Sequence, residues 1–228
     1  MNWSLECVVV IPCLNEGKTI GGLVKAIRRF LPEVLVVDDG SSDATSELAR
    51  EQGAEVIRRD QPSGKGAALQ LGCRTAREHG ATWVLTMDGD GQHSPEDIPL
   101  FLNAALSEQA RLVIGNRMSQ TNRMPWLRRK VNAWMSARLS RAAGLFVPDS
   151  QCGFRLIHLE SLHTLQIQTT HFEIESEVLL GFAARRFKIA FVPIQTIYGA
   201  EHSKINPVSD TLRWLRWWAG NCRSGGKK

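Results

Sequence analysis

The chain has 228 residues, 43% of them hydrophobic and 22% charged, with a formal net charge of +5. This composition is typical of a soluble globular protein with one substantial core, and it excludes a disordered or fibrous chain. Five scattered cysteines without a C-x-x-C pair argue against a disulfide framework or structural zinc and favour a reducing cytosol. With no signal peptide and no apolar run of about 20 residues, we expect a cytoplasmic protein that contacts a membrane only peripherally, at its cytoplasmic face.

The first half of the chain alternates predicted strands and helices. β-Branched runs predict strands over 6–12, 33–40, 54–60, 82–88 and 110–117. Helical patterns lie between them over 19–30, 44–53 and 64–80, and Ser94-Pro95 opens a further helix. Asp43 is placed to cap the second helix and Gly53 to end it. Near-continuous apolar strands that alternate with helices predict an α/β fold, a mostly parallel sheet with helices on both faces.

The second half has a different rhythm. From Gln109 to Pro148 the chain has no Asp or Glu. A basic amphipathic helix is predicted over 125–143, with an apolar stripe of Leu127, Val131, Trp134, Met135 and Ala142. A helix over 172–186, a strand over 188–194 and a Trp/Arg-rich tail follow. We interpret residues 1–228 as one domain with a first half of 6–117, a second half of 118–205 and a tail of 206–228.

Polar side chains are predicted to meet at one edge of the sheet. The residues that end or follow the first, second, fourth and fifth strands are Pro12, Asn15, Glu16, Asp38, Asp39, Asp88, Asp90 and Arg117. In an open parallel sheet, ligands bind beyond the carboxyl ends of the strands. The convergence of these residues therefore predicts a ligand site at that edge.

Several familiar ligand motifs do not fit the chain. An EF-hand that begins at Asp88 needs Gly at its sixth position and Glu at its twelfth, where this chain has His93 and Pro99. Residues 64–69 lack the third glycine of a dinucleotide fingerprint, and PSGKGA is not a P-loop. The Gly64-Lys65-Gly66 turn either brings Lys65 and the backbone close to a phosphate at a helix start or is a flexible helix-initiating turn.

Four segments occur in the order VVIPCLNE, VVDDGSSDAT, GKGAAL and LTMDGDGQHSPEDIP. Together they resemble family 2 glycosyltransferases of the GT-A fold, and within that family the polyprenol-phosphate sugar transferases such as dolichol-phosphate mannose synthase. The later segments VIGNR, DSQCGFRLI and FEIESEVLLGFAARRFKIAFVPIQTIY extend the resemblance to about residues 8–205. The resemblance implies an inverting, metal-dependent transfer of a hexose from a nucleotide-sugar, of the GDP-mannose or UDP-glucose type, to a polyprenyl phosphate.

The donor site follows from this resemblance and from the chemistry of a leaving diphosphate. Asp88, Asp90 and the amide oxygen of Gln92 are the expected ligands of Mg²⁺ or Mn²⁺, which prefer oxygen ligands. The expected nucleotide-sugar-binding residues are Pro12, Asn15, Glu16, Asp38, Asp39, Lys65 and Asp88. The alternative is that both aspartate pairs form ordinary solvated turns.

An acceptor phosphate is already an anion, so it needs charge balance rather than a general base. The residues expected to bind it are Arg117, either Arg128 or Arg129, and Lys204, because the forked donors of arginine suit phosphate. Asp90, Arg117, Lys204 and Glu175 are the expected catalytic residues. The alternative for the basic segment, residues 109–148, is that its arginines and lysine lie on a solvated helix face.

Other interpretations stay open at this point. Glu175 is either catalytic or a buried partner of an arginine, and with Asp149 it is a candidate base if the acceptor is a glycan or small-molecule hydroxyl. The tryptophans and arginines of 211–220 predict either an interfacial helix or packing against the domain. A sugar nucleotidyltransferase would need a glycine-rich start that is absent, and intact Asp88 and Asp90 argue against a non-catalytic binding module. Few aromatic residues lie near the basic segment, so no nucleic acid partner is expected.

Overall fold

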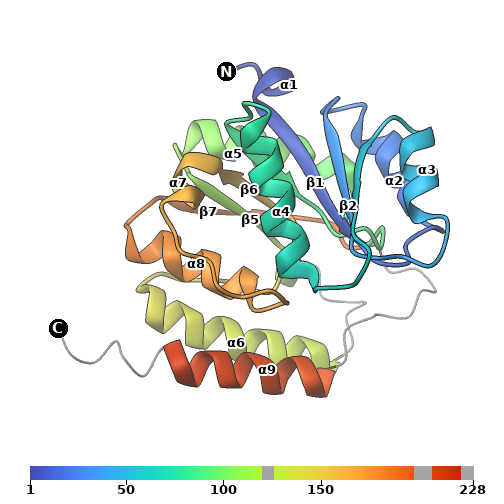
Figure 1. Cartoon of the computed structure of the whole chain (residues 1–228). Coiled ribbons are helices and arrows are strands. Elements are labelled where there is room, and N and C mark those ends of the chain that lie inside the picture. The colour runs from blue at the N-terminus through green and yellow to red at the C-terminus, as the bar shows by residue number, and fades with distance from the viewer. Residues whose placement is uncertain (120–125, 198–206, 222–228) are drawn as a thin grey trace.

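One seven-stranded sheet organises the protein (Figure 1). This computed structural model describes residues 1–119, 126–197 and 207–221. The strands are β1 (Cys7–Cys13), β2 (Val34–Asp38), β3 (Glu55–Arg58), β4 (Trp83–Thr86), β5 (Leu112–Asn116), β6 (Arg155–His158) and β7 (Ile189–Pro193). They lie in the order β3-β2-β1-β4-β6-β5-β7, and only β6 runs antiparallel to its neighbours β4 and β5.

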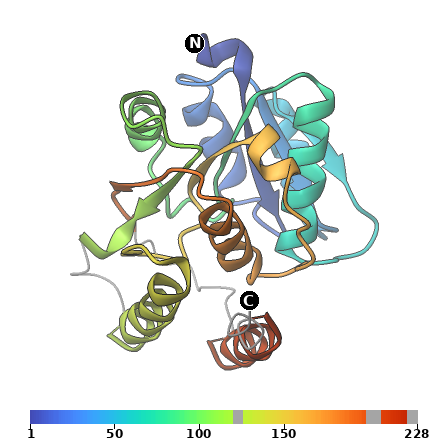
Figure 2. The same cartoon turned by 90° about the vertical axis from the view of Figure 1, so that its left-hand side faces the viewer.

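Helices cover both faces of this sheet. They are α1 (Trp3–Glu6), α2 (Ile20–Ile27), α3 (Thr45–Glu51), α4 (Lys65–Glu78), α5 (Ile98–Ser107), α6 (Trp126–Ala143), α7 (Leu159–His163), α8 (Ile174–Ala184) and α9 (Pro207–Asn221), with 3₁₀ turns η1 (Pro95–Asp97) and η2 (Arg117–Ser119). Helix α4 packs against β1 and β2, and α5 packs against β5 and β7. Figure 2 shows α4 and α5 on opposite sides of the sheet. The mostly parallel sheet with helices on both faces is therefore confirmed.

The prediction from sequence lacked the two short helices α1 and α7. They are four and five residues long, which is too short for a helical period to stand out from the apolar pattern. Ser94-Pro95 opens the 3₁₀ turn η1 rather than the α-helix itself, which begins at Ile98. The prediction also lacked the four-residue strand β6, because its antiparallel pairing between β4 and β5 depends on residues far away in the sequence. The order of the remaining strands and of the longer helices is as predicted.

The direction of the parallel strands places their carboxyl ends together. β1 begins directly after α1, and Figure 1 shows α1 at one end of the sheet and the pair α6 and α9 at the other. The last residue of β1, Cys13, pairs with Asp38 at the end of β2. All residues of β2 and β4 are buried, as expected for mostly apolar strands in a sheet that is covered on both faces. Polar residues that follow these strands therefore meet at the edge that faces α6 and α9.

Helix α6 buries a different face from the predicted one. Its buried residues are Asn132, Met135, Ser136 and Leu139. Of the predicted stripe only Met135 is buried, Val131 is half-buried, and the exposed members are Leu127, Trp134 and Ala142. The prediction weighed hydrophobicity alone, whereas α6 also buries small polar groups: the Ser136 hydroxyl donates to Ser150 Oγ at 3.0 Å.

Helix α9 is fastened to the domain by Trp214. This side chain is 2% exposed and packs with Met135 and Leu139 of α6. Its Nε1 donates to Ser176 Oγ of α8 at 2.9 Å, and its ring stacks on Trp218 with centroids 5.2 Å apart. The predicted packing of a tail tryptophan against the domain is thus found at Trp214. Among the described helices, none has the length and apolar composition needed to cross a membrane.

Gly72 in α4 and Gly22 in α2 provide a matched test of how closely α4 packs on the sheet. A Cβ at Gly72 would lie 2.4 Å from Val10 Cγ1, whereas one at Gly22 would meet nothing within 4 Å. We expect Gly72→Ala to lower the free energy of unfolding by about 1–3 kcal/mol through overpacking. Gly22→Ala should raise it by about 0.5–1 kcal/mol, because alanine has the higher helix propensity. Urea unfolding followed by circular dichroism measures the free energy of unfolding of both variants. Similar changes in Gly72→Ala and Gly22→Ala would contradict the close packing of α4 on the sheet.

Candidate active site

The loops that follow β1 and β2 are tied to each other at the carboxyl edge. Asn15 has a φ of 55°, a left-handed conformation that asparagine tolerates better than most residues. Its amide donates to Ser41 Oγ at 2.8 Å, and its Oδ1 accepts the Ser42 amide at 2.8 Å. Asp43 accepts the first amide of α3 at 3.1 Å and the Gly17 amide at 3.0 Å. The predicted helix cap therefore also holds the first loop in place.

The two aspartates at the end of β2 have different surroundings. Asp38 is fully buried, and its carboxylate accepts the Ser41 amide at 2.8 Å and the Ser46 hydroxyl. Asp39 is 4% exposed and accepts the Gly64 amide at 2.8 Å. Asp38 thus braces the loop after β2, while Asp39 fastens the turn that opens α4 to the carboxyl edge.

Asp88 and Asp90 lie directly after β4. The Asp90 carboxylate accepts the Gln92 amide at 3.0 Å. Burial and the neighbouring charge of Asp88 raise the pKa of Asp90. Burial acts in the same direction on Asp88, but Lys65 and His93 outweigh it and hold the pKa of Asp88 well below its usual range. The two carboxylates therefore repel each other, and a cation between them would relieve that repulsion.

Lys65, the first residue of α4, contacts this acidic edge. Its Nζ lies 2.6 Å from Asp88 Oδ1 and 2.7 Å from Glu175 Oε1 of α8. Burial would lower the pKa of Lys65, but the charges of Asp88 and Glu175 raise it. Gly153 makes room for the contact, because a Cβ there would lie 2.7 Å from Asp88 Oδ1 and 2.8 Å from the Lys65 Nζ. Three segments far apart in the sequence therefore meet at one ammonium group.

The acidic edge fits a divalent cation that is shared with a phosphate. Asp88 and Asp90 carry carboxylate oxygens and Gln92 carries an amide oxygen, which are ligand types that suit such a cation. Burial and the like charge of Asp88 raise the pKa of Asp90. Mg²⁺ is usually bound by one or two carboxylates and completes its shell with waters and substrate phosphates. Within residues 1–119, 126–197 and 207–221, no three His, Cys, Asp or Glu residues form a cage for a metal ion by themselves.

Arg117 follows β5 and is paired with Asp149. Its Nε and Nη2 donate to the two Asp149 oxygens at 2.7 and 2.9 Å, and its amide donates at 3.2 Å. The two residues are 6% and 0% exposed. Burial would raise the pKa of Asp149, but Arg117 outweighs it and lowers that pKa. Asp149 is therefore a permanently ionised partner of Arg117 and a poor general base.

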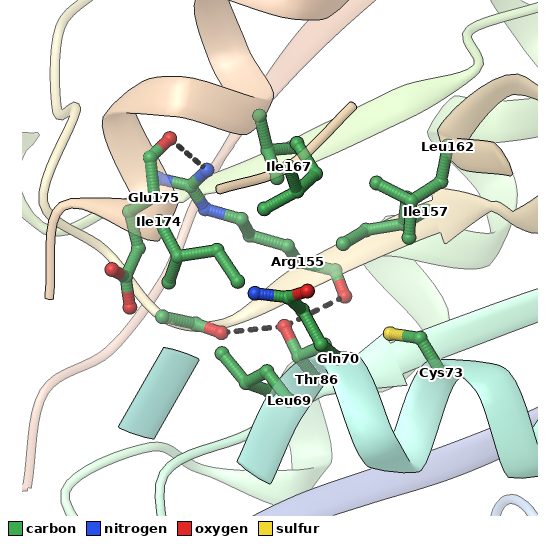
Figure 3. A pocket seen from close by; sticks show the side chains of 12 residues that line it. Leu69, Gln70, Cys73, Thr86, Arg155, Ile157, Leu162, Ile167, Ile174 and Glu175 are labelled. Atoms are coloured by element: carbon green, nitrogen blue, oxygen red, sulfur yellow. Dashed lines mark hydrogen bonds between the residues drawn. The ribbon is translucent and has the colours of Figure 1, made fainter. Parts of the chain in front are cut away.

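Glu175 lies in the first turn of α8 and is 5% exposed. The buried Arg155 donates to its backbone carbonyl at 2.6 Å rather than to its carboxylate. Figure 3 shows this bond beside an apolar cavity of about 40 Å³. Arg155 also donates to the carbonyls of Cys152 and Ser150, both at 2.8 Å. The charged partner of the Glu175 carboxylate is thus Lys65 and not the arginine that the sequence suggested as one alternative.

The remaining predicted residues lie at the edge, on α6 or outside the described residues. Pro12 is half-buried at the end of β1, and the amide of the half-buried Glu16 donates to Thr45 Oγ1 at 2.8 Å. Arg128 is half-buried and Arg129 is exposed, both on α6. Lys204 falls in 198–206, outside the residues that the structure describes.

His93 was not among the predicted site residues. Its side chain is 3% exposed, with Nε2 at 3.6 Å from Asp88 Oδ2 and its ring 5.3 Å from that of Phe154. Lys65 and His93 thus face different oxygens of Asp88. The signal was that His93 directly follows Gln92. Its burial could not be foreseen, because it depends on a β-bridge to Thr196, which lies far away in the sequence.

Solved structures that are similar to this fold are glycosyltransferases of the GT-A fold. Glucosyl-3-phosphoglycerate synthase from Mycobacterium tuberculosis, solved with Mn²⁺, UDP and phosphoglyceric acid, is similar with a TM-score of 0.70. Its sequence is 24% identical, and the similarity covers 92% of this chain and 75% of that one. The predicted GT-A fold is therefore confirmed.

The family described as Glycosyl transferase family 2 matches residues 8–165. The chain belongs to this family and is a glycosyltransferase. The UDP-N-acetylglucosamine–dolichyl-phosphate N-acetylglucosaminyltransferase of Methanococcus voltae is 30% identical over 213 residues, 83% of this chain and 85% of its own. The dolichyl-phosphate hexose transferase of Haloferax volcanii is 32% identical over 206 residues, 89% and 87% of the two chains. The resemblance stated from the order of the motifs is confirmed.

The buried pair of Arg117 and Asp149 predicts how Asp149→Asn affects stability. The substitution leaves the Arg117 charge buried without a counter-charge, so we expect a loss of about 3–5 kcal/mol near neutral pH. The pKa of Asp149 is lowered from an ordinary value of 3.8. The carboxylate therefore contributes its full stability above about pH 4 and loses it as the pH falls toward the lowered folded pKa. The difference in the free energy of unfolding between wild type and Asp149→Asn should therefore become smaller as the pH falls below about 4.

Urea unfolding at a series of pH values measures this difference. Glu160→Gln is the matched control, because Glu160 forms an exposed pair with Arg77 at 3.0 Å. It should change stability little, since exposed ion pairs are screened by solvent. An Asp149→Asn variant as stable as this control would contradict the buried pair.

Proposed function

We propose that this enzyme transfers a hexose from a nucleotide-sugar, of the GDP-mannose or UDP-glucose type, to a polyprenyl phosphate, with inversion at the sugar carbon. The observation that carries the proposal is the meeting of Asp88 and Asp90 with Lys65 at the edge where β5 also delivers Arg117. It is supported by relatives named for dolichyl-phosphate transfer. A solved structure of the same fold, bound to UDP and Mn²⁺, supports the donor class.

The donor is assigned to the loops after β1, β2 and β4. The nucleoside side of the donor is assigned to Pro12, Asn15, Glu16 and Asp39. The predicted contact of Asp38 is replaced by a bracing role, because its side chain is fully buried and both carboxylate oxygens accept hydrogen bonds from the loop and from α3. Lys65 is assigned to the diphosphate, since its ammonium lies at the acidic edge and carries the positive charge that phosphate needs. Asp88, Asp90 and Gln92 would hold Mg²⁺ or Mn²⁺, which supplies Lewis-acid stabilisation of the nucleoside diphosphate leaving group when bound.

The acceptor phosphate is assigned to Arg117. Asp149 engages Nε and Nη2 and so fixes the plane of the guanidinium, and the proposal gives Nη1 to the phosphate. A phosphate acceptor needs no general base, which agrees with an Asp149 that is held ionised by Arg117. A glycan or small-molecule hydroxyl acceptor would need such a base. Lys204 and either Arg128 or Arg129 are assigned to the same phosphate from the sequence.

A peripheral contact with the cytoplasmic face of a membrane is assigned to α6 and α9. A stripe with a spacing of four residues runs along α6, made of Trp126, Lys130, Trp134 and Arg138. Lys130 Nζ lies 5.0 Å from the Trp126 ring, and the Arg138 guanidinium lies 4.4 Å from the Trp134 ring. Beside α6 in Figure 1, α9 carries the exposed Leu212. Tryptophan together with cations is typical of helices that bind anionic lipid surfaces.

A transfer assay with purified protein tests the reaction. The donors are a panel of radiolabelled nucleotide-sugars with Mg²⁺ or Mn²⁺, and the acceptors are a short polyprenyl phosphate and the polyprenol that lacks the phosphate. We expect labelled sugar on the phosphate only. Asp90→Ala and a chelator should each lower transfer at least about a hundredfold, because they remove several kcal/mol of leaving-group stabilisation.

Asp60→Asn, at an exposed surface carboxylate, is the control and should leave transfer unchanged. Equal transfer to the polyprenol would contradict the phosphate acceptor. Metal-dependent hydrolysis of one nucleotide-sugar without a lipid product would support the donor and contradict the phosphate acceptor. The next acceptors to test would then be hydroxyl compounds, with Glu175 as the base to substitute.

Sedimentation with lipid vesicles tests the membrane face. We expect binding to vesicles that contain phosphatidylglycerol, weaker binding to phosphatidylcholine alone, and release by salt. The double variant Trp126→Ala, Leu127→Ala should lower the partition coefficient by about tenfold or more, since two apolar side chains no longer enter the interface. The matched control is Leu100→Ala, Leu106→Ala, which removes two exposed apolar side chains from α5 instead of α6. Equal losses in both pairs would exclude α6 as the contact.

A further inference from the structure

Lys65 is a single cation placed between two anions. Its Nζ contacts Asp88 Oδ1 at 2.6 Å on one side and Glu175 Oε1 at 2.7 Å on the other. The side chain is 15% exposed, and the Phe172 ring lies 5.5 Å from the ammonium. One of its partners, Asp88, belongs to the edge that fits a divalent cation, whereas the other lies inside α8. A divalent cation at that edge would have to compete with Lys65 for the same carboxylate oxygen.

Glu175 depends on Lys65 for its charge balance. Its carboxylate oxygens are buried, and within the described residues they accept no hydrogen bond beyond the contact with the ammonium. The nearby guanidinium of Arg155 donates to the backbone carbonyl of Glu175 instead. A buried carboxylate without a partner costs several kcal/mol. The contact between Lys65 and Glu175 is therefore favoured whether or not a cation binds at Asp88.

We propose that Lys65 is a placeholder cation, which neutralises Asp88 until a divalent cation binds and then withdraws onto Glu175. The proposal rests on the metal-dependent transfer proposed above. It makes Glu175 a positioning residue, which acts by giving the displaced ammonium a second site. The ammonium then stays beside the acidic edge, ready to face the donor diphosphate, and the flexible four-carbon stem of lysine allows the small shift.

The geometry of the backbone supports an exchange at this position. Gly153 lies against Asp88 and Lys65 so closely that a Cβ there would be 2.7 Å from each Asp88 oxygen and 2.8 Å from the Lys65 Nζ. Gly66 directly follows Lys65, and a Cβ at Gly66 would lie 2.6 Å from the backbone carbonyl carbon of Thr170. The turn that carries Lys65 is therefore packed against the backbone of Thr170, where the Ala67 amide also donates to the Thr170 carbonyl at 3.0 Å. The exchange then needs only the lysine side chain to move.

The proposal predicts opposite effects for two variants. In Lys65→Met, Glu175→Gln the competing ammonium is absent and no charge is left unpaired at position 175, so the fold is preserved better than by Lys65→Met alone. Asp88 loses its cation and is left open to a divalent cation. A divalent cation should bind this variant more tightly. In Glu175→Gln the ammonium has Asp88 as its remaining carboxylate partner, so a divalent cation should bind more weakly. A merely structural role for the three residues would weaken binding in both variants.

Mn²⁺ binding without nucleotide, followed by the electron paramagnetic resonance of the free ion, measures this. We expect the double variant to bind Mn²⁺ roughly tenfold more tightly than wild type, since one neighbouring charge commonly changes the affinity of a site for a cation by this factor or more. Glu175→Gln should bind several-fold more weakly. The matched control is Lys25→Met, Glu33→Gln, which removes one positive and one negative charge at exposed positions and should match wild type.

The outcomes separate this inference from the proposed function. If Asp90→Ala abolishes Mn²⁺ binding but the double variant binds like wild type or more weakly, the placeholder role is overturned and the metal-dependent transfer stands. The same holds if Glu175→Gln does not weaken binding. If wild-type Mn²⁺ binding is insensitive to Asp90→Ala, the ion lies elsewhere and both the inference and the proposed metal site fail.

Discussion

Compensation of buried charge at the carboxyl edge of the sheet is the constraint on which the site depends. Parallel strands end at the same edge, so β4 brings the neighbouring carboxylates of Asp88 and Asp90 to a place where they repel each other. Lys65 from α4 balances Asp88, and Asp149 balances Arg117 beside β5. An unpaired buried charge costs several kcal/mol. The Lys65–Asp88 contact therefore fixes the start of α4 against the end of β4, and the Arg117–Asp149 pair fixes the loop before β6 against the end of β5.

The helices of the candidate membrane face are joined to the candidate acceptor site by a polar network. Ser136 of α6 donates to Ser150 Oγ at 3.0 Å, and Trp214 of α9 donates to Ser176 Oγ of α8 at 2.9 Å. The Gln151 amide group contacts both Ser150 and Ser176, at 3.0 and 3.3 Å. The loop that holds the arginine assigned to the acceptor phosphate is therefore positioned by the same helices that would lie on the lipid. An acceptor with a lipid tail and a phosphate head suits that arrangement.

The fold and the acidic edge were predictable because they follow from local patterns. Near-continuous apolar runs indicated the buried strands, and the aspartates that end them had to meet at one edge. The buried face of α6 was not predictable in the same way. Its apolar stripe pointed to Leu127 and Trp134, both exposed, whereas the structure buries Ser136 against Ser150. A hydroxyl is buried only if a partner from another element satisfies it, and no local pattern shows that partner.

The sequence by itself determined the alternating strands and helices of the first half, the carboxylates that end these strands and the family, because each of these is written in contiguous residues. The antiparallel strand β6 was decided by its pairing with β4 and β5. Tertiary structure alone decided the partners of the charged groups. Glu175 could have paired with an arginine but contacts Lys65, from a helix more than a hundred residues earlier in the chain. Arg117 and Asp149 form their pair in the same way. Which opposite charge a buried side chain meets depends on how separate elements pack, and this packing minimises the cost of burying charge over the whole chain.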